Sequence, residues 1–259
     1  MREFNLRNNI GEEYRLNSLD NFFHSPEGLG FQRNAVYQKI GTRYEIVRDG
    51  FRQQPIAGQI MFKSDERASA YNRYLKFKNF LQEIPLTLVY RIPGGEFKMD
   101  VVPNMVEKTE INSSLGMNVG IELMPLSMWY KEVSILNTSG ACTVESDSVI
   151  ESPCCISFTG AVKSNQELVW EQIVDGTLVT RGRLTGVTLY SDEKVFIRTD
   201  TDPYGLYKVA GGNIISLYEK SDFSTKRFPF IRKGSNYFTL LATSVTEFKF
   251  EGRILYETV

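Results

Sequence analysis

The side chains best suited to acid–base chemistry are three carboxylates, Glu145, Asp147 and Glu151. Alternate side chains of a strand lie on one face, so a strand here would align these acids. Paired carboxylates on either side of a glycosidic bond carry out its hydrolysis in most glycosidases. Serines separate the acids, however, and Pro153 follows closely, which is typical of a solvated edge strand or loop. We therefore expect no catalysis here, and a wall-cleaving glycosidase using Glu145 and Asp147 is the least favoured alternative.

Nucleophilic catalysis would have to use His24, because it is the only histidine of the chain. The surrounding sequence is turn-like and lacks the Gly-x-Ser-x-Gly pattern of a nucleophile elbow. The nearby Gly28-Leu29-Gly30-Phe31 lacks the third glycine, the preceding buried strand and the following helix of a dinucleotide site. We interpret His24 as structural and the glycines as loop residues that allow positive φ.

A third candidate is a group of aromatic residues that could stack on a sugar, comprising Trp170, Tyr190, Tyr204 and Tyr207. Aromatic side chains on a β-sandwich more often belong to the core or to a subunit interface. The core interpretation is preferred. A carbohydrate-binding protein that grips a bacterial wall glycan through its C-terminal half is the main alternative.

The cysteines indicate neither a disulfide framework nor a metal site. Cys142, Cys154 and Cys155 are odd in number and two of them are adjacent, which favours a reducing cytoplasm during folding. With one histidine and no Cys-x-x-Cys pair, a zinc site is not expected. The sequence therefore predicts no catalytic, cofactor-binding or metal-binding residue.

Charge and hydropathy exclude several further classes. The net charge is −1, with 17 basic and 16 acidic residues in positions 1–137 and 13 and 15 in positions 138–259. The basic spots Arg181-Gly182-Arg183 and Lys226-Arg227 are too short for a nucleic-acid footprint. The N-terminus has no apolar signal region, and no apolar run is long enough to span a membrane. The balance suits a surface that contacts other proteins.

One helix is predicted in a chain that otherwise favours strands. Ser64 or Asp65 can cap a helix over Glu66–Gln82, which Pro85 then stops. At about 100° per residue, one broad apolar arc is expected. The arc contains Ala68, Tyr71, Tyr74, Leu75, Phe77 and Leu81.

Strand patterns fill the rest of the chain and predict a mainly β fold. In the first half they cover Val36–Val47, Ile56–Lys63, Leu86–Arg91, Glu96–Val101, Met105–Ile111 and Leu115–Leu123. The turn-rich Asn137-Thr138-Ser139-Gly140 marks a domain boundary, giving domains 1–137 and 138–259. Beyond it, short strands at intervals of about 8–12 residues are typical of a β-sandwich. They include Val187–Tyr190, Val195–Thr199, Ile214–Tyr218, Tyr237–Leu241, Thr246–Phe250 and Arg253–Tyr256.

The order of features resembles the distal tail proteins of long-tailed bacteriophages. In the first half the similar segments are Phe22-Phe23, Gly28–Phe31, Tyr37–Gly41, Gln59–Phe62, the helix Tyr71–Phe80, Pro85–Tyr90, Lys108–Ile111 and Trp129-Tyr130. In the second half they are Asp202–Tyr207, which looks like a Pro-Tyr-Gly-x-Tyr hairpin, and Phe228–Asn236.

The resemblance implies both a fold and a role. The fold would be an N-terminal β-rich ring domain with one α-helix, followed by a galectin-like β-sandwich, or jelly roll. Six copies would form a ring at the tail tip of the virion, after assembly in the host cytoplasm. The ring would connect the tail tube to the tail-tip protein and to receptor-binding or baseplate proteins. Its lumen would pass the tape measure and, as cargo only, DNA. The resemblance implies no enzyme activity, no cofactor and no membrane partner.

Overall fold

The computed structural model describes residues 2–40, 42–48, 50–63, 67–109, 116–163, 165–222, 228–241 and 245–259. Within these residues the fold is mainly β with one α-helix, which confirms the predicted fold class. The chain divides into unit 1, Met1–Tyr130 with Tyr256–Val259, and unit 2, Lys131–Leu255. This division falls inside strand β12 (Trp129–Asn137), seven residues before the boundary expected from the sequence. The turn at 138–140 ends that strand, and the last four residues return to unit 1.

Unit 1 is built on antiparallel strands in the order β2-β1-β9-β10-β11-β8-β3. Their bounds are β1 Glu3–Arg7, β2 Glu13–Arg15, β3 Asn21–Glu27, β8 Ile56–Phe62, β9 Leu86–Ile92, β10 Gly95–Lys108 and β11 Met117–Pro125. The sequence suggested two strands where β10 is one. Its first half pairs with β9 and its second half with β11, with an irregularity between Pro103 and Met105.

Helix α1 (Arg67–Phe80) contributes one face to the core of unit 1. This face is rotated slightly from the apolar arc predicted from the sequence. The inward positions are Ala70, Tyr74, Phe77 and Leu81, at i, i+4, i+7 and i+11, and Phe77 is fully buried. Ala68 and Tyr71, expected on this arc, are exposed, and Leu75 is only half-buried. The aromatic ring of Tyr14, from β2, explains the rotation, because it packs 5.0 Å from Phe77 and 5.4 Å from Phe80. The expected capping residues lie outside the described part of the chain.

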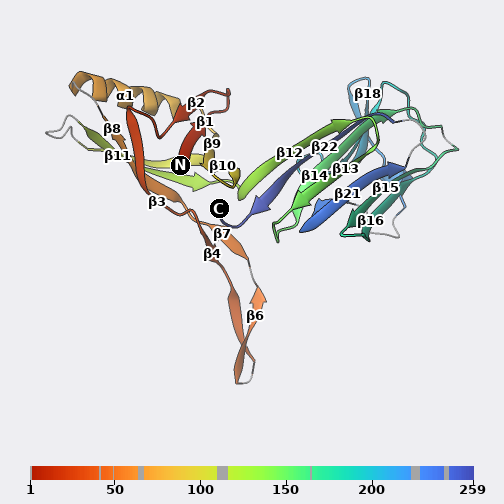
Figure 1. Cartoon of the computed structure of the whole chain (residues 1–259). Coiled ribbons are helices and arrows are strands. Elements are labelled where there is room, and N and C mark those ends of the chain that lie inside the picture. Colours follow the sequence, from red (N-terminus) through yellow and green to blue (C-terminus); the bar gives the residue numbers. More distant parts are fainter. Residues whose placement is uncertain are drawn as a thin grey trace. The chain divides into compact units, whose positions relative to one another are not determined.

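A two-stranded ribbon follows β3, where the sequence suggested a single strand over Val36–Val47. It consists of β4 (Phe31–Arg33) paired with β7 (Phe51–Gln53) and β5 (Val36–Ile40) paired with β6 (Arg43–Arg48). Gly28 begins the ribbon with a φ of +79°, and a Cβ there would lie 1.9 Å from the Pro55 carbonyl oxygen. Only glycine tolerates both that backbone conformation and that approach. Figure 1 shows the ribbon standing out from the other strands of unit 1.

Unit 2 contains two antiparallel sheets. One runs in the order β19-β18-β17-β14-β22-β12, and the other is four-stranded with the order β13-β21-β15-β16. The bounds are β13 Ala141–Ser146, β14 Ser152–Gly160, β15 Leu168–Val174, β16 Thr177–Leu184, β17 Lys194–Arg198, β18 Gly205–Ala210, β19 Asn213–Ser216, β20 Phe230–Ile231, β21 Gly234–Leu241 and β22 Val245–Tyr256, with a 3-10 helix at Tyr218–Lys220.

Two strand predictions for unit 2 are wrong. The segment Val187–Tyr190 forms only an isolated bridge, between Val162 and Leu189. The two strands expected at Thr246–Phe250 and Arg253–Tyr256 are one continuous strand, β22, which passes through Gly252. A Cβ at Gly252 would lie 2.8 Å from Cδ1 of Ile231, so the glycine lets β22 run close beside β20 instead of turning.

Aromatic side chains from both sheets form the core of unit 2. Trp170 of β15 is 1% exposed, and Phe158, Phe238, Phe248 and Phe250 are fully buried. The rings of Phe238, on β21, and Phe250, on β22, lie 4.6 Å apart. This contact joins the two sheets face to face, as expected for a β-sandwich.

Candidate functional site

The exposed ribbon of unit 1 is the most unusual surface of the described residues. Its two strand pairs have the registers Phe31↔Gln53 and Tyr37↔Ile46, and every residue of β5 is exposed. Exposed large apolar side chains occur along its whole length. They are Phe31, Val36, Tyr37, Ile40, Tyr44, Ile46, Val47 and Phe51. Exposed apolar side chains gathered on one element are typical of an interaction site.

The two tyrosines of β5 and β6 lie on one side of the ribbon. Tyr37 pairs with Ile46, and Lys39 pairs with Tyr44, and residues two positions apart share a face. Tyr37 and Tyr44 are 59% and 69% exposed, so this side faces solvent. The other side carries the polar pair formed by Gln38 and Glu45, and Ile40 paired with Arg43. The ribbon therefore offers one aromatic and one more polar face.

Charge distinguishes the ribbon from the rest of unit 1. Residues 31–53 contain five basic and two acidic residues, a net charge of +3. The remainder of residues 1–130 contains eleven basic and thirteen acidic residues, a net charge of −2. Opposite net charges favour contact between the ribbon of one molecule and the body of another.

An open pocket of about 370 Å³ with a mixed polar and apolar lining lies where the ribbon meets the body of unit 1. Its lining includes Phe51 of β7 and the segment Met124–Met128 at the end of β11. Leu126 is 59% exposed there. The Gln53 side chain donates to the Glu257 carbonyl oxygen at 3.0 Å, which anchors the base of the ribbon to the C-terminal residues of unit 1. Flexible methionines beside an exposed leucine form a surface that can accept an apolar side chain of another protein.

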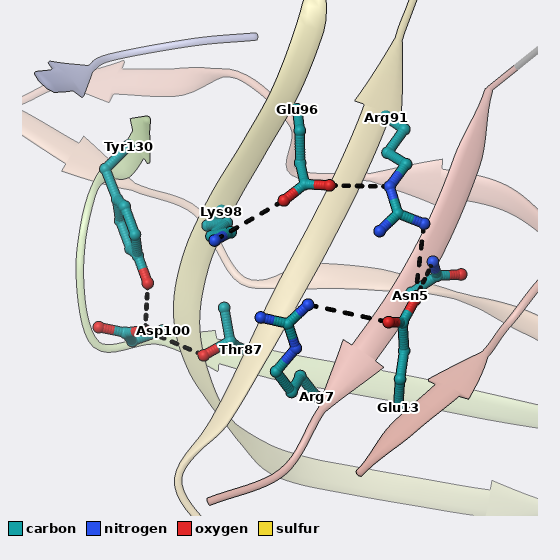
Figure 2. A network of polar contacts seen from close by, with 9 residues as sticks. All are labelled: Asn5, Arg7, Glu13, Thr87, Arg91, Glu96, Lys98, Asp100 and Tyr130. Carbon is teal, nitrogen blue, oxygen red and sulfur yellow. Dashed lines mark hydrogen bonds and ion pairs between the residues drawn. The ribbon is translucent and has the colours of Figure 1, made fainter. Parts of the chain in front are cut away.

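A second surface is the charged face of the sheet formed by β2, β1, β9 and β10, shown in Figure 2. Arg91 Nε donates to Glu96 at 2.8 Å, and Arg91 Nη1 lies 3.5 Å from Glu13. Glu13 also lies 3.8 Å from Arg7 and accepts a 2.6 Å hydrogen bond from the Asn5 amide. Charges from four strands are thereby joined into one network.

The network continues along β10 toward β12. Lys98 Nζ lies 3.7 Å from Glu96, and Asp100 accepts hydrogen bonds from Tyr130 at 2.8 Å and from Thr87 at 3.3 Å. Burial alone would raise the pKa of Glu96, but the Arg91 hydrogen bond and the charges of Arg91 and Lys98 lower it. Glu96 and Asp100 thus each accept hydrogen bonds from neighbouring side chains. The face is therefore suited to specific polar contacts.

The charged face carries a signal that the sequence interpretation missed. Glu96, Lys98 and Asp100 alternate with the buried Phe97, Met99 and Val101, which is the pattern of a strand with one polar face. Their partners on β1, β2 and β9 are distant in sequence, so the network itself could not be inferred without the strand registers.

The three candidate carboxylates of unit 2 do not form a catalytic pair. Strand β13 ends at Ser146, so Asp147 and Glu151 do not continue the face of Glu145. Glu145 accepts a 2.6 Å hydrogen bond from Ser235, and Glu151 lies 3.1 Å from Arg232. The intervening serines, Ser146 and Ser148, are buried, contrary to the expected wet segment.

The remaining candidates are also dispersed. The ring of His24 stacks on Phe22 at 5.9 Å, and its Nδ1 lies 3.3 Å from the Ser25 hydroxyl. Trp170 is buried in the core, whereas Tyr190 and Tyr204 are each 63% exposed and Tyr207 is buried. The expected aromatic group is thus split between core and surface.

All three cysteines are free and buried. Burial raises the pKa of Cys142 to about 12 and is the main cause of the rise to about 11 for Cys155. High thiol pKa values make these cysteines unreactive. Of the basic spots, Arg181 lies 3.4 Å from Glu171 on the neighbouring strand, and Lys226-Arg227 lies outside the described residues.

The part of the chain that the structure describes offers neither a metal site nor a membrane-spanning helix. It contains no group of three or more His, Cys, Asp or Glu side chains arranged to hold a metal ion. None of its helices has the length and apolar character needed to cross a membrane.

Comparison with known proteins finds a sequence match for the N-terminal domain and a similar fold for the whole chain. The sequence profile of the distal tail protein N-terminal domain matches residues 3–126. Chains of the phage p2 baseplate in its activated conformation resemble the fold over 100% of both chains at 14% identity, with TM-scores of 0.61 for the structure with Sr and 0.60 for the one with Ca. The SPP1 Dit (gp 19.1) protein has a TM-score of 0.66 at 11% identity, covering 97% of this chain and 99% of that one.

No curated protein sequence matches the chain. The similar structures share its fold at low identity, and the sequence match is to the N-terminal domain, over residues 3–126. Residues 3–126 therefore form a distal tail protein N-terminal domain.

Proposed function

We infer that the chain is a structural hub protein of a phage tail tip and that six copies form a closed ring. The observation that carries this proposal is the exposed apolar ribbon of unit 1. A free monomer would leave the ribbon in water, whereas a head-to-tail contact repeated by rotation buries it in every copy. The number six follows from the resemblance to distal tail proteins.

The body of a neighbouring copy is the partner that best fits the ribbon. The ribbon has a net charge of +3, and the rest of residues 1–130 has a net charge of −2. The apolar side chains of Phe51, Met124, Leu126 and Met128 in the open pocket offer a place for an aromatic or aliphatic side chain of the next ribbon. Both features recur in each copy, as a heterologous interface requires.

The ring would connect the tail tube to the tail-tip protein and carry receptor-binding or baseplate proteins. Its lumen would pass the tape measure and DNA, and its place would be the tail tip of the virion. The family of the N-terminal domain supports this role, as does the fold shared with a p2 baseplate chain and with SPP1 Dit, which is described as a hub of an adsorption apparatus. The role is structural and requires no catalysis.

Removing the aromatic face of the ribbon should abolish the ring. In the triple variant Tyr37→Ser, Tyr44→Ser, Ile46→Ser, three exposed apolar side chains are lost from one face. Because none of them contributes to the core, the free energy of unfolding should change by less than about 1 kcal/mol. Analytical ultracentrifugation should therefore find folded monomer where the parent chain forms the ring.

The matched control is Gln38→Ser, Glu45→Ser, a cross-strand pair on the opposite face of the same ribbon. This variant should keep the parent oligomeric state. An unchanged ring in the triple variant would show that the aromatic face is not the contact.

A further inference from the structure

We propose that unit 2 binds a neutral saccharide on the outer face of its β17-β14-β22-β12 sheet region. A cavity of about 590 Å³ lies over these neighbouring strands. It is lined by the carboxylates of Glu132, Asp200 and Glu251 and by the guanidinium groups of Arg198 and Arg253. A cavity of this volume suits a small ligand.

The central arginine of the cavity is held in one orientation. Arg198 Nε lies 2.8 Å from Asp200, and Arg198 Nη1 donates to the Tyr207 hydroxyl at 3.4 Å. The Arg198 and Asp200 side chains are only 23% and 22% exposed. Arg198 and Glu251 both lie opposite Cys155 in the strand registers, so they occupy the same row of the sheet face. Fixed polar groups lose little conformational entropy when a ligand binds.

An aromatic platform lies beside this row. Phe196 shares the outer face of β17 with Arg198, and its ring stacks on Tyr207 at 5.0 Å with an interplanar angle of 15°. Lys194 Nζ and Arg198 Cζ each lie 5.9 Å from the centre of the Phe196 ring. The half-buried Phe196 therefore presents an apolar surface next to charged groups.

These groups match the chemistry of a sugar ring. A pyranose has an apolar C–H face and a rim of hydroxyls, each of which both donates and accepts hydrogen bonds. Guanidinium groups only donate hydrogen bonds, and ionised carboxylates only accept them. A guanidinium beside a carboxylate can therefore bind two neighbouring sugar hydroxyls, one as acceptor and one as donor. Three carboxylates and two guanidinium groups nearly cancel in charge, which disfavours an inorganic anion. Ser134 and Thr201 add two hydroxyls to the lining.

Binding is measured with the full-length protein by isothermal titration calorimetry. The probes are the methyl glycosides of glucose, galactose, rhamnose and N-acetylglucosamine, together with lactose and inorganic phosphate. At least one sugar should bind with a millimolar dissociation constant, and more tightly than phosphate. Failure of every sugar to bind at tens of millimolar, or tighter binding of phosphate, would overturn the proposal.

Two variants locate the site. Glu251→Gln keeps the size of the side chain but removes its charge, and Phe196→Leu keeps an apolar side chain but removes the flat ring. Each should weaken the binding of that sugar at least about tenfold. Arg181→Gln changes an exposed arginine on the other sheet and should leave binding unchanged. Sugar binding that survives both site variants would place the ligand elsewhere and contradict the assignment, whatever their effect on thermal stability.

Discussion

The Phe77→Asp variant should fail to fold unit 1. Phe77 is fully buried on α1, with its ring 5.0 Å from Tyr14 and 5.7 Å from Phe62. Removing a buried Phe side chain alone costs about 3–5 kcal/mol, and an unpaired buried charge adds to that cost. The loss approaches the whole stability of a domain, about 5–15 kcal/mol. Soluble yield and urea unfolding followed by circular dichroism would measure the effect.

The matched control for the helix is Asn79→Asp, which adds the same charge to an exposed position of α1. A carboxylate near a helix C-terminus costs only about 0.3–1 kcal/mol, so this protein should be soluble and folded. If Phe77→Asp unfolded at the same urea concentration as the parent protein, α1 could not be part of the core. Leu75, on the arc expected from the sequence, is half-buried and is the weaker position for this test.

The second large effect is expected at Asn236, a fully buried residue of β21. Its Nδ2 donates to the carbonyl oxygens of Arg232 at 2.6 Å, Gly234 at 3.0 Å and Val144 at 3.2 Å. Its Oδ1 accepts from the Arg232 amide at 2.9 Å and from Gln172 Nε2 at 3.0 Å. One amide thus satisfies buried polar groups from β13, β15 and the turn before β21.

Asn236→Leu should cost about 4 kcal/mol, because it leaves several buried polar groups without partners and each such group costs about 1–3 kcal/mol. Gln172 links the same network to β20, since it donates to the Phe230 carbonyl oxygen at 2.6 Å. Denaturant unfolding would give the change in free energy. Ser235→Ala, at the neighbouring and more exposed position, should cost less than about 1 kcal/mol. Equal costs for the two variants would mean that the network does not stabilise unit 2.

The sequence predicted those parts of the fold that depend on local patterns. The alternation of apolar and polar residues predicted β8 and β9. The helical spacing of apolar residues predicted α1 close to its observed bounds. Strands β10 and β22 each contain a residue that looks like a strand end, Pro103 and Gly252, but the neighbouring strands hold them in the sheet. Local sequence patterns do not show whether a strand continues past such a residue, so β10 and β22 are each predicted as two separate strands.

The contact surfaces were harder to predict because they depend on pairing between distant segments. The alternation over Val36–Val47 fits a strand as well as a hairpin, and only the register Ile40↔Arg43 shows the turn. The charged face joins Glu13 to Arg91, which are far apart in sequence.

The mass of the full-length chain in solution, measured by native mass spectrometry over a range of concentrations, tests the proposed ring most directly. One chain has a mass of 29.6 kDa, so six copies amount to about 178 kDa. We expect a single discrete species of that mass, because a closed ring satisfies every ribbon and does not grow further. Monomer alone at every concentration, or a series of steadily increasing masses, would contradict a closed six-fold ring.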